Sequence, residues 1–252
     1  MRSFRSHAIS IGVAILQRPY AICFPFFALV IAVTWSVRDN FFFWDTMQLA
    51  SQHAHFFYEN NNFSTFLLPD EMDSGHPPTF GFYLAVMWCI FGKSLTVSHL
   101  VMLPFLLGSV WQAWKLGEKI VGEGWTLWFL LLLVVCPVIA GQAVLASPDI
   151  VLLFFFLMAL NGIFDYDLLD FQGYFDLKLG HNIRKTFKIS LTSKYELSIA
   201  ILGLSAISMR GMMVVAALFI FHFLIKIPYL KALILNKKQL KINKNNSEIN
   251  QL

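Results

Sequence analysis

The amino-acid sequence predicts an all-α integral membrane protein with about six transmembrane helices and one long loop on the outer side of the membrane. Of its 252 residues, 57% are hydrophobic and only 13% are charged, and that charged share is about half of what is usual in soluble domains. The mean hydropathy is +0.63, so the chain has more apolar side chains than one soluble core of this size buries. These side chains gather in uncharged runs that have the length of membrane-spanning helices.

Six runs are candidates for membrane spans. A helix needs about 20 mostly apolar residues to cross the hydrocarbon core of a bilayer. The runs are uncharged except for Arg210 in the last one, and they cover residues 20–37, 79–92, 94–114, 125–148, 150–164 and 197–225. The second and fifth runs are short for a span.

The basic residues predict the orientation. Residues 1–19 contain three Arg and no acid, and residues 226–252 contain six Lys and one Glu. Positive flanks stay in the cytoplasm, so we expect a cytoplasmic N-terminal segment, a membrane module over residues 20–225, and a disordered cytoplasmic tail. An even number of crossings then places residues 38–78 and 165–196 outside and Asp149 inside.

The first half of the outer loop predicts an amphipathic helix on the membrane surface. Its polar residues recur at steps of three and four, which places them on one helical face: Asp45, Gln48, Gln52, His55 and Glu59. A solvated face is the simpler interpretation of this stripe. Asp45 differs from the others because it lies in the first turn of the helix, directly after four aromatic residues.

The second half of the loop concentrates charge ahead of a proline pair. Asp70, Glu71, Asp73 and His76 lie within seven residues, and Pro77-Pro78 suits the start of the next helix. A carboxylate here could act as a general base, and His76 could bind an anion or a metal. An acidic, solvated loop is the alternative interpretation.

Arg210 is the single charge in the last apolar run. It lies thirteen residues after Leu197, which is ~20 Å along a continuous helix and past the middle of a ~30 Å hydrocarbon core. An arginine at that depth usually faces a cavity, a partner or an anionic ligand, whereas an interfacial arginine can extend its charge to water. Asp149 follows Pro148 and could accept free N–H groups at a helix start.

The order of these features resembles the GT-C membrane glycosyltransferases, especially the branch with protein O-mannosyltransferases, aminoarabinose transferases and the RgtA/B/C/D-like domain. The resemblance covers roughly residues 20–225 and depends on the order and spacing of short motifs. They are an acid after the first span, Gly75-His76-Pro77-Pro78, Phe91-Gly92-Lys93-Ser94-Leu95, Cys136-Pro137, the stretch from Ser147-Pro148-Asp149 to Leu153, Gly203-Leu204-Ser205 and Arg210-Gly211.

The resemblance implies a glycosyltransferase that takes a sugar from a polyprenyl-phosphate donor at the outer face, with inversion. Asp45 then matches the general base, and His76 and Arg210 match positive groups near the donor phosphate. Some relatives have Glu where this chain has Gly75, so Glu71 or Asp73 would substitute for it in substrate binding. No residue is assigned as a metal ligand, although a divalent metal remains an allowed cofactor.

Members of this family usually have more spans, so the chain corresponds to roughly the N-terminal half of their module. A truncated or inactive chain, or a second membrane subunit that supplies the missing helices, is compatible with that length. The expected partners are membrane lipid and the lipid-linked donor, without nucleic acid, in a bacterial inner membrane. A non-catalytic membrane scaffold or partner subunit is the alternative function, and a small transporter is a third.

Overall fold

The structure is a computed structural model that describes residues 19–61, 63–72, 74–122, 124–179 and 183–224, and the side chains of residues 19–20 and 166–193 are not among those described. Every regular element in these ranges is a helix, which confirms the all-helical prediction for them. The elements are α2 (Pro19–Ser36), the π-helix η1 (Met47–Gln52), α3 (His53–Glu59), the 3-10 helix η2 (Asp70–Met72), α4 (Thr79–Phe91), α5 (Leu95–Leu100), α6 (Leu103–Ile120), α7 (Thr126–Val135), α8 (Pro137–Ala143), α9 (Pro148–Leu179) and α10 (Ile183–Ile207), followed by the helix Met209–Leu224.

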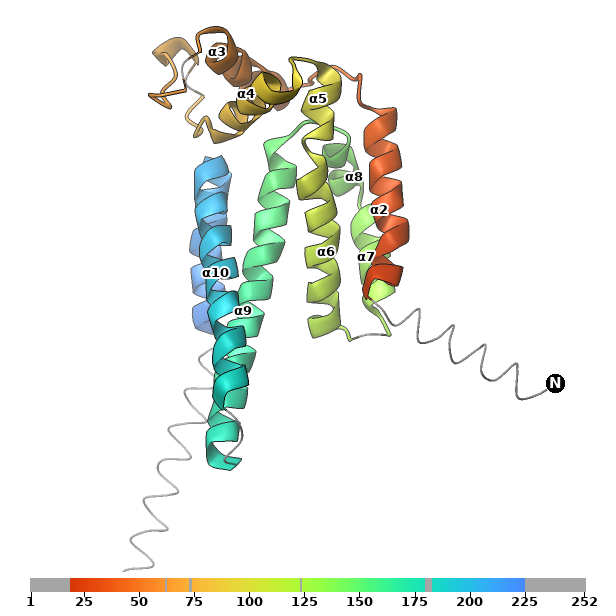
Figure 1. The fold of residues 1–252 in the computed structure, drawn as a ribbon, viewed down its shortest axis with the longest axis vertical. Coiled ribbons are helices and arrows are strands. Elements are labelled where there is room, and N and C mark those ends of the chain that lie inside the picture. The colour runs from red at the N-terminus through yellow and green to blue at the C-terminus, as the bar shows by residue number, and fades with distance from the viewer. Residues whose placement is uncertain (1–18, 62, 73, 123, 180–182, 225–252) are drawn as a thin grey trace, which may run out of the picture.

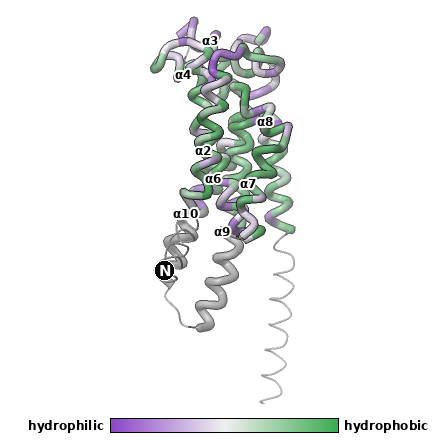
Figure 2. The backbone as a smooth tube through the Cα atoms, turned by 90° about the vertical axis from the view of Figure 1, so that its right-hand side faces the viewer, coloured by the Kyte–Doolittle hydropathy of each residue, from purple (hydrophilic) through white to green (hydrophobic). Residues whose placement is uncertain are grey.

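The helices form an elongated bundle with one covered end. α2, α6, α7, α9 and α10 run along the long axis, whereas α3 and α4 lie across one end (Figure 1). We call this end, covered by residues 38–61, 63–72 and 74–94, the loop end. The long helices are predominantly hydrophobic, and hydrophilic segments gather at the loop end (Figure 2).

The number of long apolar helices is smaller than the six predicted spans. Among the described residues, Leu95–Ile120 and Pro148–Asp165 are long and apolar enough to cross a membrane. The pair Thr126–Val135 and Pro137–Ala143 adds a third if its two parts act as one span, although they meet at an angle of 67°. Proline lacks an N–H and disrupts the preceding turn, which explains the bend at Pro137. Three further apolar helices are shorter: Ala21–Ser36, Thr79–Phe91 and Met209–Leu224.

The run at residues 79–92 does not lie along the bundle, which corrects the second predicted span. α4 instead packs against α3, and its buried face contains Phe80, Leu84 and Trp88. Gly81 permits the close approach, because a Cβ atom there would overlap the side chain of His53. Hydropathy alone cannot distinguish a helix that faces lipid from one that faces another helix, and this run does the latter.

The run at residues 197–225 is not one span either. Its first helix ends at Ile207, and a buried Ser208 begins the next helix by accepting a hydrogen bond from the Gly211 N–H at 3.3 Å. A Cβ at Gly211 would overlap the carbonyl oxygen of Leu204, a contact that a continuous helix cannot make. The chain therefore reverses direction at Ser208, and the helix Met209–Leu224 returns beside α10.

Because α4 does not lie along the bundle, each later connection up to Ser208 occupies the end opposite to the predicted one. α6 leads away from the loop end, α7 and α8 return to it, α9 leads away again and α10 returns (Figure 1). Asp149 therefore lies at the loop end, and residues 165–179 and 183–196 lie near the opposite end, both contrary to the sequence prediction. The expected cytoplasmic N-terminal segment, except for Pro19 at the start of α2, and the expected basic tail lie outside the described residues.

Candidate functional site

Three charged residues from distant parts of the chain meet at the loop end. The guanidinium of Arg210 lies 3.5 Å from Asp45, between Nη2 and Oδ2, and 3.4 Å from Asp149, between Nη1 and Oδ1. The side chains of Asp45 and Arg210 are about half exposed and that of Asp149 is one-third exposed. We call these three residues the acid–arginine cluster; its one cation lies between two carboxylates and remains open to solvent.

A tight turn positions Asp45. The buried hydroxyl of Thr46 donates to the Phe43 carbonyl at 2.7 Å and accepts from the Phe43 N–H at 2.8 Å. Trp44, between them, has a φ of +52°. This turn precedes the amphipathic helix that the sequence predicted: Asp45, Gln48, Gln52 and Glu59 are exposed, while Ala50, Ala54 and Phe57 are buried. His55, the remaining member of the predicted polar stripe, is half-buried and its Nδ1 lies 2.8 Å from the Ser51 carbonyl oxygen.

Asp149 is free to face Arg210 because another residue caps its helix. The buried hydroxyl of Ser147 accepts the Asp149 N–H at 3.2 Å. The sequence suggested that the Asp149 carboxylate would itself accept hydrogen bonds from the free N–H groups at the start of the helix. A serine at the N-cap, followed by proline at the first helical position, was the signal that the cap was already supplied.

Arg210 lies near the surface of the loop end, which corrects the predicted depth past the middle of a hydrocarbon core. The reversal at Ser208 brings Arg210 into the first turn of the helix Met209–Leu224. The last turn of α10, just before this reversal, is tied to α4, since the Thr79 hydroxyl donates to the carbonyl of Ala206. Two predicted site residues, Asp45 and Arg210, are thereby brought together, with Asp149 as a third member that the crossing parity had placed at the wrong end.

The other predicted binding residues lie on the segment that leads into α4. Within the described part of the chain, no hydrogen bond or ion pair joins Glu71 or His76 to the acid–arginine cluster. Glu71 is exposed in η2, and His76 is half-buried with Nδ1 shielded and without a hydrogen-bond partner. Asp73 lies outside the described residues. Gly75 has a φ of +69°, a left-handed conformation that favours glycine over residues with a side chain.

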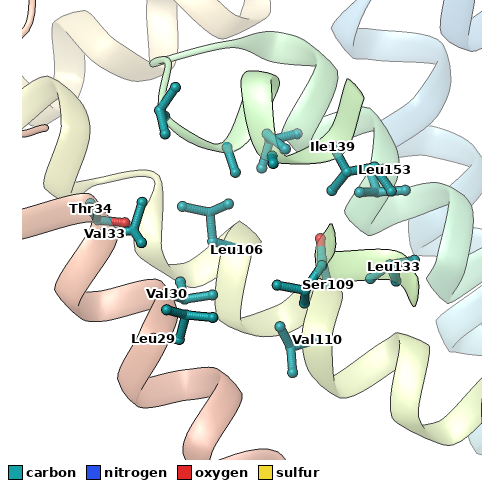
Figure 3. Close-up of a pocket in the computed structure, with 15 residues that line it drawn as sticks. Leu29, Val30, Val33, Thr34, Leu106, Ser109, Val110, Leu133, Ile139 and Leu153 are labelled. Atoms are coloured by element: carbon teal, nitrogen blue, oxygen red, sulfur yellow. The ribbon is translucent and has the colours of Figure 1, made fainter. Parts of the chain in front are cut away.

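An apolar cavity of about 240 Å³ lies between α2, α6, α7, α8 and the start of α9 (Figure 3). Ile150 lines it, one residue after Asp149, so the cavity extends close to the acid–arginine cluster. Thr34 and Ser109 contribute hydroxyls to an otherwise aliphatic lining. The labelled side chains around it come from several helices: Leu29, Val30, Val33, Leu106, Val110, Leu133, Ile139 and Leu153.

The described residues do not form a recognisable metal centre. No group of three or more His, Cys, Asp or Glu side chains that could hold a metal ion occurs among the described residues. The two carboxylates of the acid–arginine cluster share the arginine instead. The arrangement can hold an anion at the guanidinium and accept a proton at a carboxylate.

Comparisons of the chain with protein families, curated proteins and solved structures found no match. The class of protein is therefore defined by the described structure itself. It is an all-helical protein with two or three helices long and apolar enough to cross a membrane, and with an open cluster of charged side chains at one end of its bundle.

Proposed function

We propose that this chain is a multi-pass membrane glycosyltransferase of the GT-C type, which transfers a sugar from a polyprenyl-phosphate donor to an acceptor at the outer face of a bacterial inner membrane. One observation carries the proposal. The acid–arginine cluster, assembled from three distant segments, lies next to an apolar cavity that Ile150 lines. A lipid-linked phosphate requires this combination of a cation and an apolar surface.

The proposed topology keeps six crossings but assigns them differently. α2, α5 with α6, α7 with α8, α9, α10 and the helix Met209–Leu224 each cross the bilayer, while α4 lies at its outer surface. The loop end then faces outward, and both chain termini remain on the cytoplasmic side with the basic flanks. The kink at Pro137 and the short helices are tolerated because neighbouring helices surround them.

Arg210 binds the donor phosphate in this proposal. A guanidinium presents five N–H donors in a planar fork that suits phosphate oxygens. Its contacts with Asp45 and Asp149, at 3.4–3.5 Å, are longer than strong charge-assisted hydrogen bonds of about 2.7–2.9 Å. The guanidinium can therefore still donate hydrogen bonds to a phosphate, while its contact with Asp149 keeps the Arg210 side chain oriented. Glu71, Asp73 and His76 contribute to substrate binding from the adjoining segment, and the polyprenyl chain extends into the apolar cavity.

Asp45 acts as the general base. The acceptor hydroxyl oxygen attacks the anomeric carbon, the bond from that carbon to the phosphate oxygen breaks, and Asp45 takes the hydroxyl proton. The electron pair leaves with the polyprenyl phosphate, whose charge Arg210 stabilises. Attack on the face opposite the leaving phosphate inverts the anomeric centre.

A non-catalytic scaffold or partner subunit is the second candidate function. It is favoured by the large apolar side chains that the helix Met209–Leu224 exposes: Met209, Met212, Met213, Phe219, Ile220, Phe221, Phe223 and Leu224. Helices of a second membrane subunit would cover them in the same way as lipid does. In that case Arg210, already held by two carboxylates, orders the loop end without a reaction.

The test is sugar transfer in membranes that express the chain, with and without the products of its genomic neighbours, from radiolabelled polyprenyl-phosphate sugars. Asp45→Asn removes the base but retains size and hydrogen bonding, and we expect transfer to fall on the order of 10²–10⁴-fold. Glu59→Gln is the matched control, since this carboxylate lies on the same polar stripe but pairs with Lys93 at 2.8 Å. Transfer that Asp45→Asn leaves intact, or no transfer under any of these conditions, would favour the scaffold. Chelation in the same assay tests whether a divalent metal takes part.

A further inference from the structure

Trp44 is held in an unusual conformation beside the acid–arginine cluster. Its φ of +52° lies in the left-handed region, which bulky side chains rarely adopt. The residue is nevertheless 77% exposed, so burial of its side chain does not stabilise this conformation. Backbone strain of this kind persists only where neighbouring contacts enforce it, and it concentrates at functional sites.

Thr46 enforces the turn. Its side chain is 3% exposed and makes both hydrogen bonds with the Phe43 backbone, while the Met47 N–H donates to the Trp44 carbonyl at 2.9 Å. These bonds fix the backbone on both sides of Trp44 and Asp45. The turn therefore directs two adjacent side chains outward, a flat aromatic ring and the carboxylate that contacts Arg210.

Trp35 provides the contrast. It is also largely exposed, but it lies in the last turn of α2 with an ordinary helical backbone, and the guanidinium of Arg38 lies 4.4 Å from the centre of its ring. Such a tryptophan at a helix end is typical of the interface between membrane and water. An interfacial anchor of that kind needs no strained backbone, so the conformation of Trp44 requires a different explanation.

We infer that Trp44 is a stacking platform for the sugar ring of the donor, placed next to Asp45 by the Thr46 turn. One face of a pyranose or furanose ring presents C–H groups that pack against the face of an indole, a large and rigid surface with a polar N–H at its edge. A ring stacked there lies one residue from the base. The inference rests on the proposed function, because it assigns the ligand of the same site.

The first experiment measures binding without transfer. The chain contains seven Trp, so the fluorescence difference between wild type and Trp44→Phe isolates Trp44, and the difference with Trp35→Phe isolates Trp35. The protein is placed in phosphatidylethanolamine–phosphatidylglycerol vesicles. We expect a polyprenyl-phosphate sugar to shield Trp44 from iodide quenching and polyprenyl phosphate without the sugar to shield it less, whereas a brominated phospholipid should quench Trp35.

Two outcomes would overturn the inference. If the brominated lipid quenches Trp44 and the sugar has no effect, Trp44 is an interfacial anchor. If a free methyl glycoside shields Trp44 when polyprenyl phosphate is bound, and the donor sugar adds nothing, the platform holds an acceptor ring instead. Shielding by the donor sugar together with unchanged transfer by Asp45→Asn would refute the proposed base but keep the sugar platform.

Two variants at Trp44 separate stacking from simple hydrophobic contact. Trp44→Phe retains a flat ring, while Trp44→Leu retains only apolar character. We expect Trp44→Leu to raise the donor concentration for half-maximal binding on the order of three- to tenfold, as loss of one aromatic contact implies, and Trp44→Phe to raise it less. Phe41→Leu is the control, because Phe41 is 81% exposed but four residues from Asp45. Equal effects of Trp44→Leu and Phe41→Leu would reject the platform.

Discussion

Two groups of charged side chains lie at opposite ends of the bundle and differ in the length of their contacts and in their exposure to solvent. At the loop end, Arg210 contacts Asp45 and Asp149 at 3.4–3.5 Å with one-third to one-half of each side chain exposed. At the other end, Lys119 contacts Asp165 at 2.7 Å and Lys115 contacts Glu196 at 3.2 Å, with less than one-third exposed. The first group has spare capacity for hydrogen bonds and the second has little.

The second group continues into a buried network that joins α6, α9 and α10. Asn161 is fully buried, donates to the Gln112 carbonyl at 2.7 Å and to its Oε1 at 2.9 Å, and accepts from Lys119 at 2.9 Å. Polar contacts of this kind fix the packing of helices in an apolar environment. A charge whose partners satisfy it is thus suited to hold helices together, whereas a charge whose contacts are long and exposed keeps capacity for a ligand.

The largest expected effect concerns the side of the membrane on which each group lies. We expect single cysteines at Asn61 and Tyr195 to be labelled by an impermeant thiol reagent from opposite sides, on a background in which the three native cysteines are replaced. The topology predicted from the sequence places residues 165–196 on the same side of the membrane as the loop. Labelling of both cysteines from the same side would therefore support that topology and would contradict the placement of Asp149 beside Asp45.

The next effect separates function from stability at the loop end. Arg210→Ala should lower transfer on the order of 10²–10³-fold, as loss of one donor to a developing charge does, and Arg210→Lys should recover part of it because charge remains without the fork. Arg38→Lys is the control, since Arg38 lies at the same end but pairs with Asp39. A large fall in thermal stability of Arg210→Ala, without an effect on donor binding, would assign Arg210 a structural role.

The buried network should show the opposite pattern. Asn161→Leu leaves the polar groups of Gln112 and Lys119 with fewer partners, and an unsatisfied buried group costs about 1–3 kcal/mol. We expect a lower midpoint of thermal unfolding in detergent and unchanged half-maximal donor binding in the protein that remains folded. An unchanged midpoint would mean that the network adds nothing to helix packing.

The smallest effect is a pH dependence at the loop end. The hydrogen bond and charge of Lys93 lower the pKa of Glu59 below its ordinary value of 4.5. A carboxyl whose pKa is lowered in the folded state stabilises it above the unfolded pKa, and this contribution is lost as the pH falls through the folded pKa. The stability difference between wild type and Glu59→Gln should therefore be small at neutral pH, because the pair is exposed, and should vanish in acid. A difference that grows in acid would contradict this sign.

The sequence predicted the helical class and the amphipathic helix after Asp45, and it singled out Asp45 and Arg210, which contact each other in the structure, because periodicity and isolated charges are local signals. It could not predict the path of the chain. The apolar run of α4 reads the same whether lipid or α3 covers it, and Gly81 was its one indication of a close helix contact. Ser208, three residues before Gly211, was a local capping signal within the last run. Because the run of α4 was counted as a crossing, Asp149 was assigned to the wrong end.

The reversal at Ser208 also has a consequence for biosynthesis. In a bilayer, α10 and the helix Met209–Leu224 would leave the translocation channel as one helical hairpin, with Arg210 close to its tip. The tip must pass through the hydrocarbon once, and an arginine at the centre of a membrane helix adds about 2.5–3.5 kcal/mol on the insertion scale. Two apolar arms that enter together would offset this cost. The hairpin would then carry Arg210 across the bilayer and leave it at the far surface, outside the hydrocarbon core.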